Sequence, residues 1–193
     1  MTFTIPDGLA PEVYPLAWLV GRWNGEGVVG YPGVDESAFV QDVSFTHDGG
    51  PYLAYTSTIH LVRAPDAADS HAAGVGPVWS TESGYWRVPP ERTGGLTERQ
   101  FPVEVLLADP SGHLSLYLGA VGDGRIDLAS DLIARTASGA AVTAGKRLYG
   151  LVQGDLMWAL DLAAFGHPMQ SYASARLSRV ADAPTSPVDQ AAP

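Results

Sequence analysis

The sequence contains no cysteine, and that absence removes several chemistries at once. Without thiols the chain has no disulfide, no thiolate metal site and no cysteine nucleophile. It also lacks any apolar run of the roughly 18 residues that a transmembrane helix requires. The N-terminus has no basic region ahead of its apolar part, unlike a secretory signal peptide. We therefore expect a cytoplasmic protein.

Basic residues are scarce as well. Lysine and arginine together number 11, against 21 aspartates and glutamates, which gives a formal net charge of −10. Nucleic acids and anionic membranes both attract basic protein faces, so neither is an expected partner. A solvated acidic surface that keeps the protein soluble is the simplest interpretation of this charge.

What the sequence has in quantity is a period-two alternation of apolar and polar residues. In YLAYTSTIHLVR, Leu53, Tyr55 and Ile59 fall on one face, and Thr56 and Thr58 fall on the other. This pattern is typical of half-buried antiparallel strands. Ten strands are predicted, near residues 21–31, 37–46, 52–63, 77–88, 101–108, 113–119, 125–134, 141–152, 155–163 and 171–180.

The spacing of these strands predicts an all-β fold. Glycine-containing turns separate the strands, so an up-and-down barrel or a sandwich is favoured. We expect a ten-stranded antiparallel up-and-down β-barrel over residues 1–180, with a short helical plug at 10–21. Residues 64–76 form the longest predicted loop, which we expect to be mobile. The Ala/Pro-rich stretch 181–193 is predicted to be a disordered tail.

The segment GRWNGEG (21–27) is unusually rich in glycine for a strand. Glycine weakens a strand and marks places where the backbone bends or another group comes close. In a closed barrel the first strand pairs with both the second and the last, and Gly21, Gly25, Gly27 and Gly30 would permit the curvature needed. Trp23 is then expected to seal one end of the barrel.

These residues also carry a resemblance. GRWNGEG matches the Gly-x-Trp-x-Gly-x-Gly signature of the nitrobindin family, heme-binding barrels related to lipocalins and fatty-acid-binding proteins, at Gly21, Trp23, Gly25 and Gly27. The resemblance extends over residues 15–180. Further matching segments are HDGGPYLAYTS (47–57), ESGYWR (82–87), LYGLVQGDLMWALDLAAFGHPM (148–169) and ARLSRV (175–180).

The resemblance implies a cofactor site that this chain has changed. In heme-binding nitrobindins a histidine on the closing strand ligates ferric iron, and the corresponding position here is Tyr172. A family threonine near the heme, after the Tyr-Pro of the first hairpin, corresponds to Gly33. Both cofactor-contacting positions therefore differ, and we expect no heme and no metal.

Two residues, Tyr172 and His167, are candidate substitutes for the iron ligand. A tyrosinate holds ferric heme in some proteins, but a phenol with a pKa near 10 needs a nearby cation to ionise. Arg176 lies on the same face of the strand as Tyr172 but roughly 13 Å away. Lys146 or Arg147 would come closer only through the fold. His167 would serve only if its loop covered the cavity mouth.

Alternation does not decide which way Tyr172 points. Tyr172 shares its face of the strand with Ser174 and Arg176, whereas Ala173 and Ala175 form the more apolar face. The remaining histidines are expected in turns and loops or, for His60, on a polar strand face. Acidic residues on predicted strands are interpreted as solvated. The histidines expected in turns and loops are His47, His71 and His113, and the acidic residues expected to be solvated are Glu82, Asp127, Asp131 and Asp161.

Three functions are compatible with these patterns. The favoured one is a nitrobindin-like barrel that does not ligate heme and holds a small hydrophobic molecule in a cavity. The alternative is an enzyme that, as the resemblance implies, isomerises peroxynitrite to nitrate and binds nitric oxide at ferric heme. The third is an interaction protein without a small-molecule role, such as a homodimer. The candidate cavity residues are Trp23, Phe39, Tyr55, Trp86 and Trp158.

Overall fold

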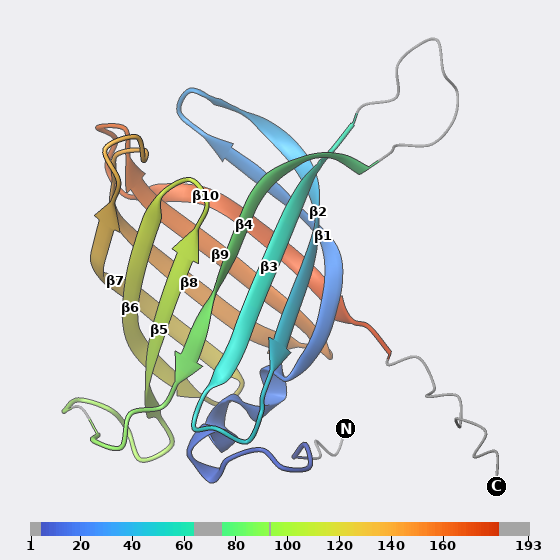
Figure 1. The fold of residues 1–193 in the computed structure, drawn as a ribbon, viewed down its shortest axis with the longest axis vertical. Coiled ribbons are helices and arrows are strands. Elements are labelled where there is room, and N and C mark those ends of the chain that lie inside the picture. The colour runs from blue at the N-terminus through green and yellow to red at the C-terminus, as the bar shows by residue number, and fades with distance from the viewer. Residues whose placement is uncertain (1–4, 64–74, 93, 182–193) are drawn as a thin grey trace, which may run out of the picture.

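The computed structural model describes residues 5–63, 75–92 and 94–181, which form one closed β-barrel (Figure 1). The predicted ten antiparallel strands and the helical plug are confirmed. The elements are η1 (Pro11–Leu19), β1 (Gly21–Tyr31), β2 (Val34–Thr46), β3 (Leu53–Val62), β4 (Val75–Arg87), β5 (Phe101–Asp109), β6 (His113–Gly122), β7 (Arg125–Arg135), β8 (Val142–Val152), β9 (Asp155–Ala164) and β10 (Gln170–Arg179).

Consecutive strands are hydrogen-bonded neighbours, and β1 also pairs with β10, so the barrel has no free edge. Among the described residues, no helix is long and apolar enough to cross a membrane. The predicted tail from residue 182 onward, and residues 64–74 of the predicted long loop, lie outside the described residues.

One end of the barrel is closed by η1, a 3-10 helix whose Leu16 and Leu19 are buried (Figure 1). Trp23 is buried against this plug, and its indole N–H donates to the Leu19 carbonyl at 2.8 Å. The Arg179 guanidinium lies 4.1 Å from the centre of the Trp23 ring and donates to the Trp18 carbonyl at 2.8 Å. Trp23 therefore lies at the plugged end, where the sequence predicted it, beneath the helix that closes the barrel.

The glycines of β1 allow β10 to approach closely. A Cβ atom added to Gly25 would lie 2.1 Å from the Arg176 carbonyl oxygen, and one added to Gly27 would lie 2.3 Å from that of Ser174. Neither space accepts a methyl group without moving backbone. Closure of the barrel between its first and last strands therefore depends on these two positions.

The half of the barrel next to the plug is filled by aromatic rings. The ring of Phe45 lies 5.0 Å from Tyr55 and 5.4 Å from Trp86, and Trp86 lies 5.1 Å from Tyr149. These edge-on and tilted contacts are geometries that aromatic pairs prefer. The two interior cavities described below lie beyond these rings, toward the opposite, open half.

Two irregularities near the open end redirect side chains. On β10, Ser171 pairs with Asp161 while Ala173 pairs with Leu160, so Tyr172 is the extra residue of a β-bulge. On β4, Val78 pairs with His60 while Ser80 pairs with Ile59, so Trp79 is extra in the same way. A bulge breaks the alternation of faces and re-aims the side chain of the inserted residue.

Candidate ligand-binding cavity

The open half of the barrel contains two adjoining cavities. The inner cavity has a volume of about 50 Å³ and the outer cavity about 210 Å³. Their walls share Ser80, Glu82, Arg147, Leu160 and Tyr172. Other residues of the inner cavity include Val29, Gln41, Tyr55, Ser57, Ile59, Trp79, Tyr149, Trp158 and Ala173. Other residues of the outer cavity include Leu107, Asp109, His113, Tyr117, Ile133, Val142, Leu162 and Phe165.

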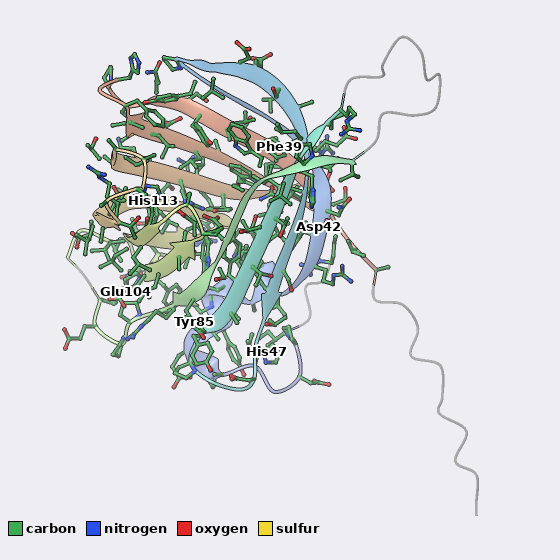
Figure 2. All side chains as sticks on the ribbon, turned by 45° about the horizontal axis from the view of Figure 1, so that its top comes forward. Phe39, Asp42, His47, Tyr85, Glu104 and His113 are labelled. Carbon is green, nitrogen blue, oxygen red and sulfur yellow. The ribbon has the colours of Figure 1, made fainter. Side chains whose placement is uncertain are left out.

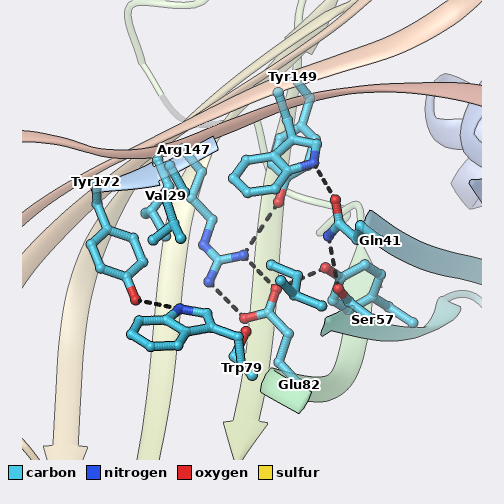
Figure 3. Close-up of a pocket in the computed structure, with 14 residues that line it drawn as sticks. Val29, Gln41, Ser57, Trp79, Glu82, Arg147, Tyr149 and Tyr172 are labelled. Carbon is cyan, nitrogen blue, oxygen red and sulfur yellow. Dashed lines mark hydrogen bonds and ion pairs between the residues drawn. The ribbon is translucent and has the colours of Figure 1, made fainter. Parts of the chain in front are cut away.

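An ion pair crosses the interior between the two cavities (Figure 3). Both guanidinium Nη atoms of Arg147 on β8 donate to the Glu82 carboxylate on β4, each at 2.7 Å. The Arg147 side chain is 11% exposed and that of Glu82 is 20% exposed, so the pair is largely removed from water. The expectation that Glu82 lies on a solvated strand face is wrong. Glu82 can point inward because Arg147, on a strand across the barrel, supplies the opposite charge that a buried carboxylate requires.

Tyrosines complete the environment of this pair. The Tyr55 hydroxyl donates to Glu82 at 2.7 Å, and Arg147 donates to the Tyr149 hydroxyl at 3.3 Å. Arg147 also lies 5.0 Å from the centre of the Tyr117 ring. Burial opposes ionisation of Glu82, but the charge and hydrogen bonds of Arg147 outweigh it, so the pKa of Glu82 is lowered. Both members of the pair are charged at neutral pH.

A second polar chain lines the inner cavity. The Trp158 indole N–H donates to Gln41 Oε1 at 2.8 Å, and the Gln41 amide donates to the Ser57 hydroxyl at 2.9 Å (Figure 3). Ser57 is buried on the same inward face of β3 as Tyr55 and Ile59. Gln41 was not singled out from the sequence, although alternation puts it on the same face of β2 as Phe39 and Val43.

The candidate cavity residues divide into two groups. Tyr55 and Trp158 line the inner cavity. Phe39 is buried and stacks on Trp158 with ring centroids 6.2 Å apart, so it supports the wall from behind. Trp86 belongs to the aromatic core of the plugged half, and Trp23 packs against η1.

Tyr172 faces the interior and contacts both cavities. Its hydroxyl accepts a hydrogen bond from the Trp79 indole N–H at 3.1 Å (Figure 3). The pKa of Tyr172 is raised, because the effect of burial is larger than the lowering effect of the hydrogen bond from Trp79. The bulge explains why alternation left this orientation open: Tyr172 and Ala173, although consecutive, both line the inner cavity.

The two arginines considered for ionising this phenol are each paired with a carboxylate. Arg176 donates to Asp155 at 2.6 Å on the exposed side of β10. Arg147 is inside the barrel, but its charge is matched by Glu82. Gly33 is an exposed residue of the β1–β2 turn with a φ of 84°. A neutral phenol is therefore the form of Tyr172 that its surroundings favour.

The histidines differ in position from several expectations. His113 was expected to be solvated, and this is wrong: it begins β6 and is buried near the open end, whereas His47 lies at the plugged end (Figure 2). The two His113 ring nitrogens lie 3.1 Å from Asp109 and 2.9 Å from the Ala140 carbonyl, so both are occupied. His60 is partly buried beside the Gly76 carbonyl. His71 lies outside the described residues.

His167 is exposed in the turn between β9 and β10. Its ring packs edge-on against Tyr31, with centroids 6.0 Å apart, and Tyr31 in turn contacts Tyr172 at 5.9 Å. His167 is therefore at the rim of the open end but does not line either cavity. Within the described part of the chain, no cluster of three or more histidine and carboxylate residues is arranged to hold a metal ion.

A plugged barrel of ten consecutive antiparallel strands, with a partly polar cavity at its open end, defines the class of closed up-and-down β-barrels. Comparison with known proteins gives the family. Residues 12–179 match the family model described as the THAP4-like, heme-binding beta-barrel domain. The chain belongs to this family of nitrobindin-like barrels.

Three similar proteins illustrate the range of descriptions within it. A "Ferric nitrobindin-like protein" of Beutenbergia cavernae is 53% identical, with 94% of this chain and 100% of that protein aligned. A "Peroxynitrite isomerase" of Frankia casuarinae is 45% identical over 94% and 92% of the two chains. The crystal structure of Rv2717c from M. tuberculosis superposes with a TM-score of 0.72 at 30% identity, covering 90% and 99% of the chains.

The family implies heme, but the described residues do not fit it. His113, the one imidazole among the described lining residues, has both nitrogens occupied. Tyr172 presents a neutral hydroxyl that already accepts a hydrogen bond. The larger cavity is about 210 Å³, the scale of a single ring, since a dry cavity of about 150 Å³ accommodates benzene. A tetrapyrrole is larger and would enter only if side chains at the open end moved aside.

Proposed function

We propose that this protein is a nitrobindin-like barrel that does not ligate heme and binds a small, mainly apolar molecule in its outer cavity. The observation that carries the proposal is the state of Tyr172. Where the resemblance implies an iron-ligating imidazole, this chain has a neutral phenol tied to Trp79 across the barrel. A neutral phenol is a poor iron ligand because the anion is the form that binds ferric heme.

The outer cavity supports the second half of the proposal. Its wall combines aliphatic and aromatic side chains with a few polar groups, which is the usual composition of a small-molecule site. The apolar part is formed by Leu107, Tyr117, Ile133, Val142, Leu160, Leu162 and Phe165. A volume of about 210 Å³ sets the ligand at the size of one substituted ring.

A hemin titration followed by absorbance tests the absence of ligation. For the wild-type protein we expect weak, featureless absorbance without a sharp Soret band. The matched control is the double variant Trp79→Ala, Tyr172→His, which places an imidazole at the inward bulge and removes the indole opposite it. We expect this variant to bind hemin saturably at one equivalent, whereas Trp79→Ala alone does not.

The outcome that contradicts the proposal is equally clear. A wild-type protein that binds hemin one-to-one, with a Soret band lost in Tyr172→Phe, ligates heme through Tyr172. Loss of the band in His167→Ala instead assigns the ligand to the β9–β10 turn. Either result would overturn the proposed absence of heme ligation.

Heme binding would favour the second candidate function, isomerisation of peroxynitrite to nitrate. The specific support for it is the name "Peroxynitrite isomerase" given to relatives, including the 45% identical protein of Frankia casuarinae. The described residues do not fit the heme that this reaction requires. The geometry therefore favours the binding function.

A further inference from the structure

The Tyr172 hydroxyl has a hydrogen-bonding capacity that the protein itself leaves unused. It accepts from Trp79 at 3.1 Å, and no acceptor among the described residues lies within hydrogen-bond distance of its proton. A phenol is both donor and acceptor. Because Tyr172 lines both cavities, its O–H group is a donor available to a molecule bound there.

The charges around the cavity act against an anionic molecule. Arg147 contacts both cavities, but its two Nη atoms are already engaged by Glu82, one of them also by Tyr149. A ligand carboxylate would therefore lose its hydration without gaining a free cation in return, since the charge of Arg147 is matched by Glu82.

A cationic molecule gains nothing from Glu82 for the same reason, since that charge is matched by Arg147. Burial of a charge without its own partner is costly. The Glu82–Arg147 pair is thus locally neutral, and the Tyr172 hydroxyl offers a neutral donor beside it. The Nε atom of Arg147 also has no hydrogen-bond partner among the described residues, but it is buried and does not reach a bound molecule. The cavity suits a neutral molecule that brings one acceptor.

We infer that the outer cavity binds an uncharged, ring-sized compound whose carbonyl or ether oxygen accepts the hydrogen bond of Tyr172, and that the Glu82–Arg147 pair excludes carboxylates. This inference rests on the proposed binding function and specifies the chemical class of the ligand. Tyr172, at the position of the iron ligand in the resemblance, is then the residue that selects for the acceptor.

Three probes of matched size test the inference: acetophenone, which has a neutral acceptor; ethylbenzene, which has none; and benzoate, which is anionic. Binding is measured by the chemical shifts of ¹⁵N-labelled protein, including the indole N–H of Trp79 assigned from Trp79→Phe. We expect acetophenone to bind about five- to tenfold more tightly than ethylbenzene, as one neutral hydrogen bond implies. Benzoate is expected to bind more weakly than either.

Two variants show whether Tyr172 is responsible. Tyr172→Phe should reduce acetophenone affinity to that of ethylbenzene and leave ethylbenzene binding within about twofold, because only the hydroxyl is removed. The control is Tyr85→Phe, which removes a hydroxyl from the exposed outer surface. It should change none of the three affinities.

Failure of the inference and failure of the proposed function give different results. If ethylbenzene binds as tightly as acetophenone, or Tyr172→Phe leaves their ratio unchanged, the cavity binds small molecules but Tyr172 does not select them. Benzoate binding more tightly than acetophenone overturns the exclusion of anions. If none of the three probes shifts any resonance, both the inference and the proposed binding function are wrong.

Discussion

Trp79 and Tyr172 are both inserted residues of β-bulges, and the indole of the first donates to the hydroxyl of the second at 3.1 Å. Their strands, β4 and β10, are separated in the barrel by β1, β2 and β3. The contact therefore crosses the exposed open end of the barrel and does not join neighbours in the sheet. Two β-bulges on distant strands thus produce one long-range hydrogen bond at the open end of the barrel.

This contact should be measurable as a coupling energy. In a double-mutant cycle with Trp79→Phe and Tyr172→Phe, we expect a coupling of about 1 kcal/mol in the free energy of unfolding, since one neutral hydrogen bond contributes that much. Urea unfolding of the four proteins provides the values. A control cycle pairing Trp79→Phe with Tyr85→Phe should show no coupling, and equal couplings in the two cycles would contradict the contact.

The Glu82–Arg147 pair should dominate the stability of the open half. Glu82→Gln preserves the shape of the side chain but leaves the Arg147 charge buried without its partner, so the free energy of unfolding should fall by about 3–5 kcal/mol. Chemical denaturation measures the loss. Asp127→Asn, which breaks an exposed ion pair with Arg125, is the control and should cost far less. Similar losses in both variants would show that the inner pair is not desolvated.

The same residue predicts a pH dependence. The pKa of Glu82 is lowered from 4.5, so its contribution to stability is complete above about 4.5 and declines as the pH falls through its value in the folded protein. The stability difference between wild type and Glu82→Gln should be constant near neutrality and narrow in acid. Other carboxylates cancel because both proteins carry them. A difference that widens in acid would have the wrong sign.

The close approach of β10 to β1 gives a further prediction. Gly27→Ala places a methyl group 2.3 Å from the Phe39 ring and from the Ser174 carbonyl, and we expect it to cost about 3 kcal/mol or to prevent folding. Gly150→Ala is the matched control, because a Cβ atom there meets nothing within 4 Å. It should change stability by less than about 0.5 kcal/mol. Thermal unfolding of both variants distinguishes them.

Much of this barrel could be predicted because its evidence is local. Alternation along β3 placed Leu53, Tyr55 and Ile59 on the inward face, where they are buried. The turns between strands were equally predictable, since glycine is favoured where φ is positive. The predicted and observed strands consequently agree to within a few residues at their ends.

The candidate site was less predictable because its residues depend on partners distant in the sequence. Glu82 was interpreted as solvated because no nearby residue suggested a partner, and Arg147 lies 65 positions away. His113 was assigned to a turn for a similar reason, although Asp109 four residues earlier was a signal that could have been used. Acidic and imidazole groups enter an interior when a specific partner compensates them, and alternation does not record such pairings.

The sequence by itself determined the ten strands and the glycine-dependent closure of β1 on β10, and its resemblance to the nitrobindins implies an iron-ligand position that Tyr172 occupies. Only the tertiary structure decided that Tyr172 points inward, that Trp79 meets it and that Glu82 and Arg147 neutralise each other inside the barrel. The physical reason is that alternation is a property of one strand, whereas a bulge and a buried charge are stabilised by residues on strands across the barrel.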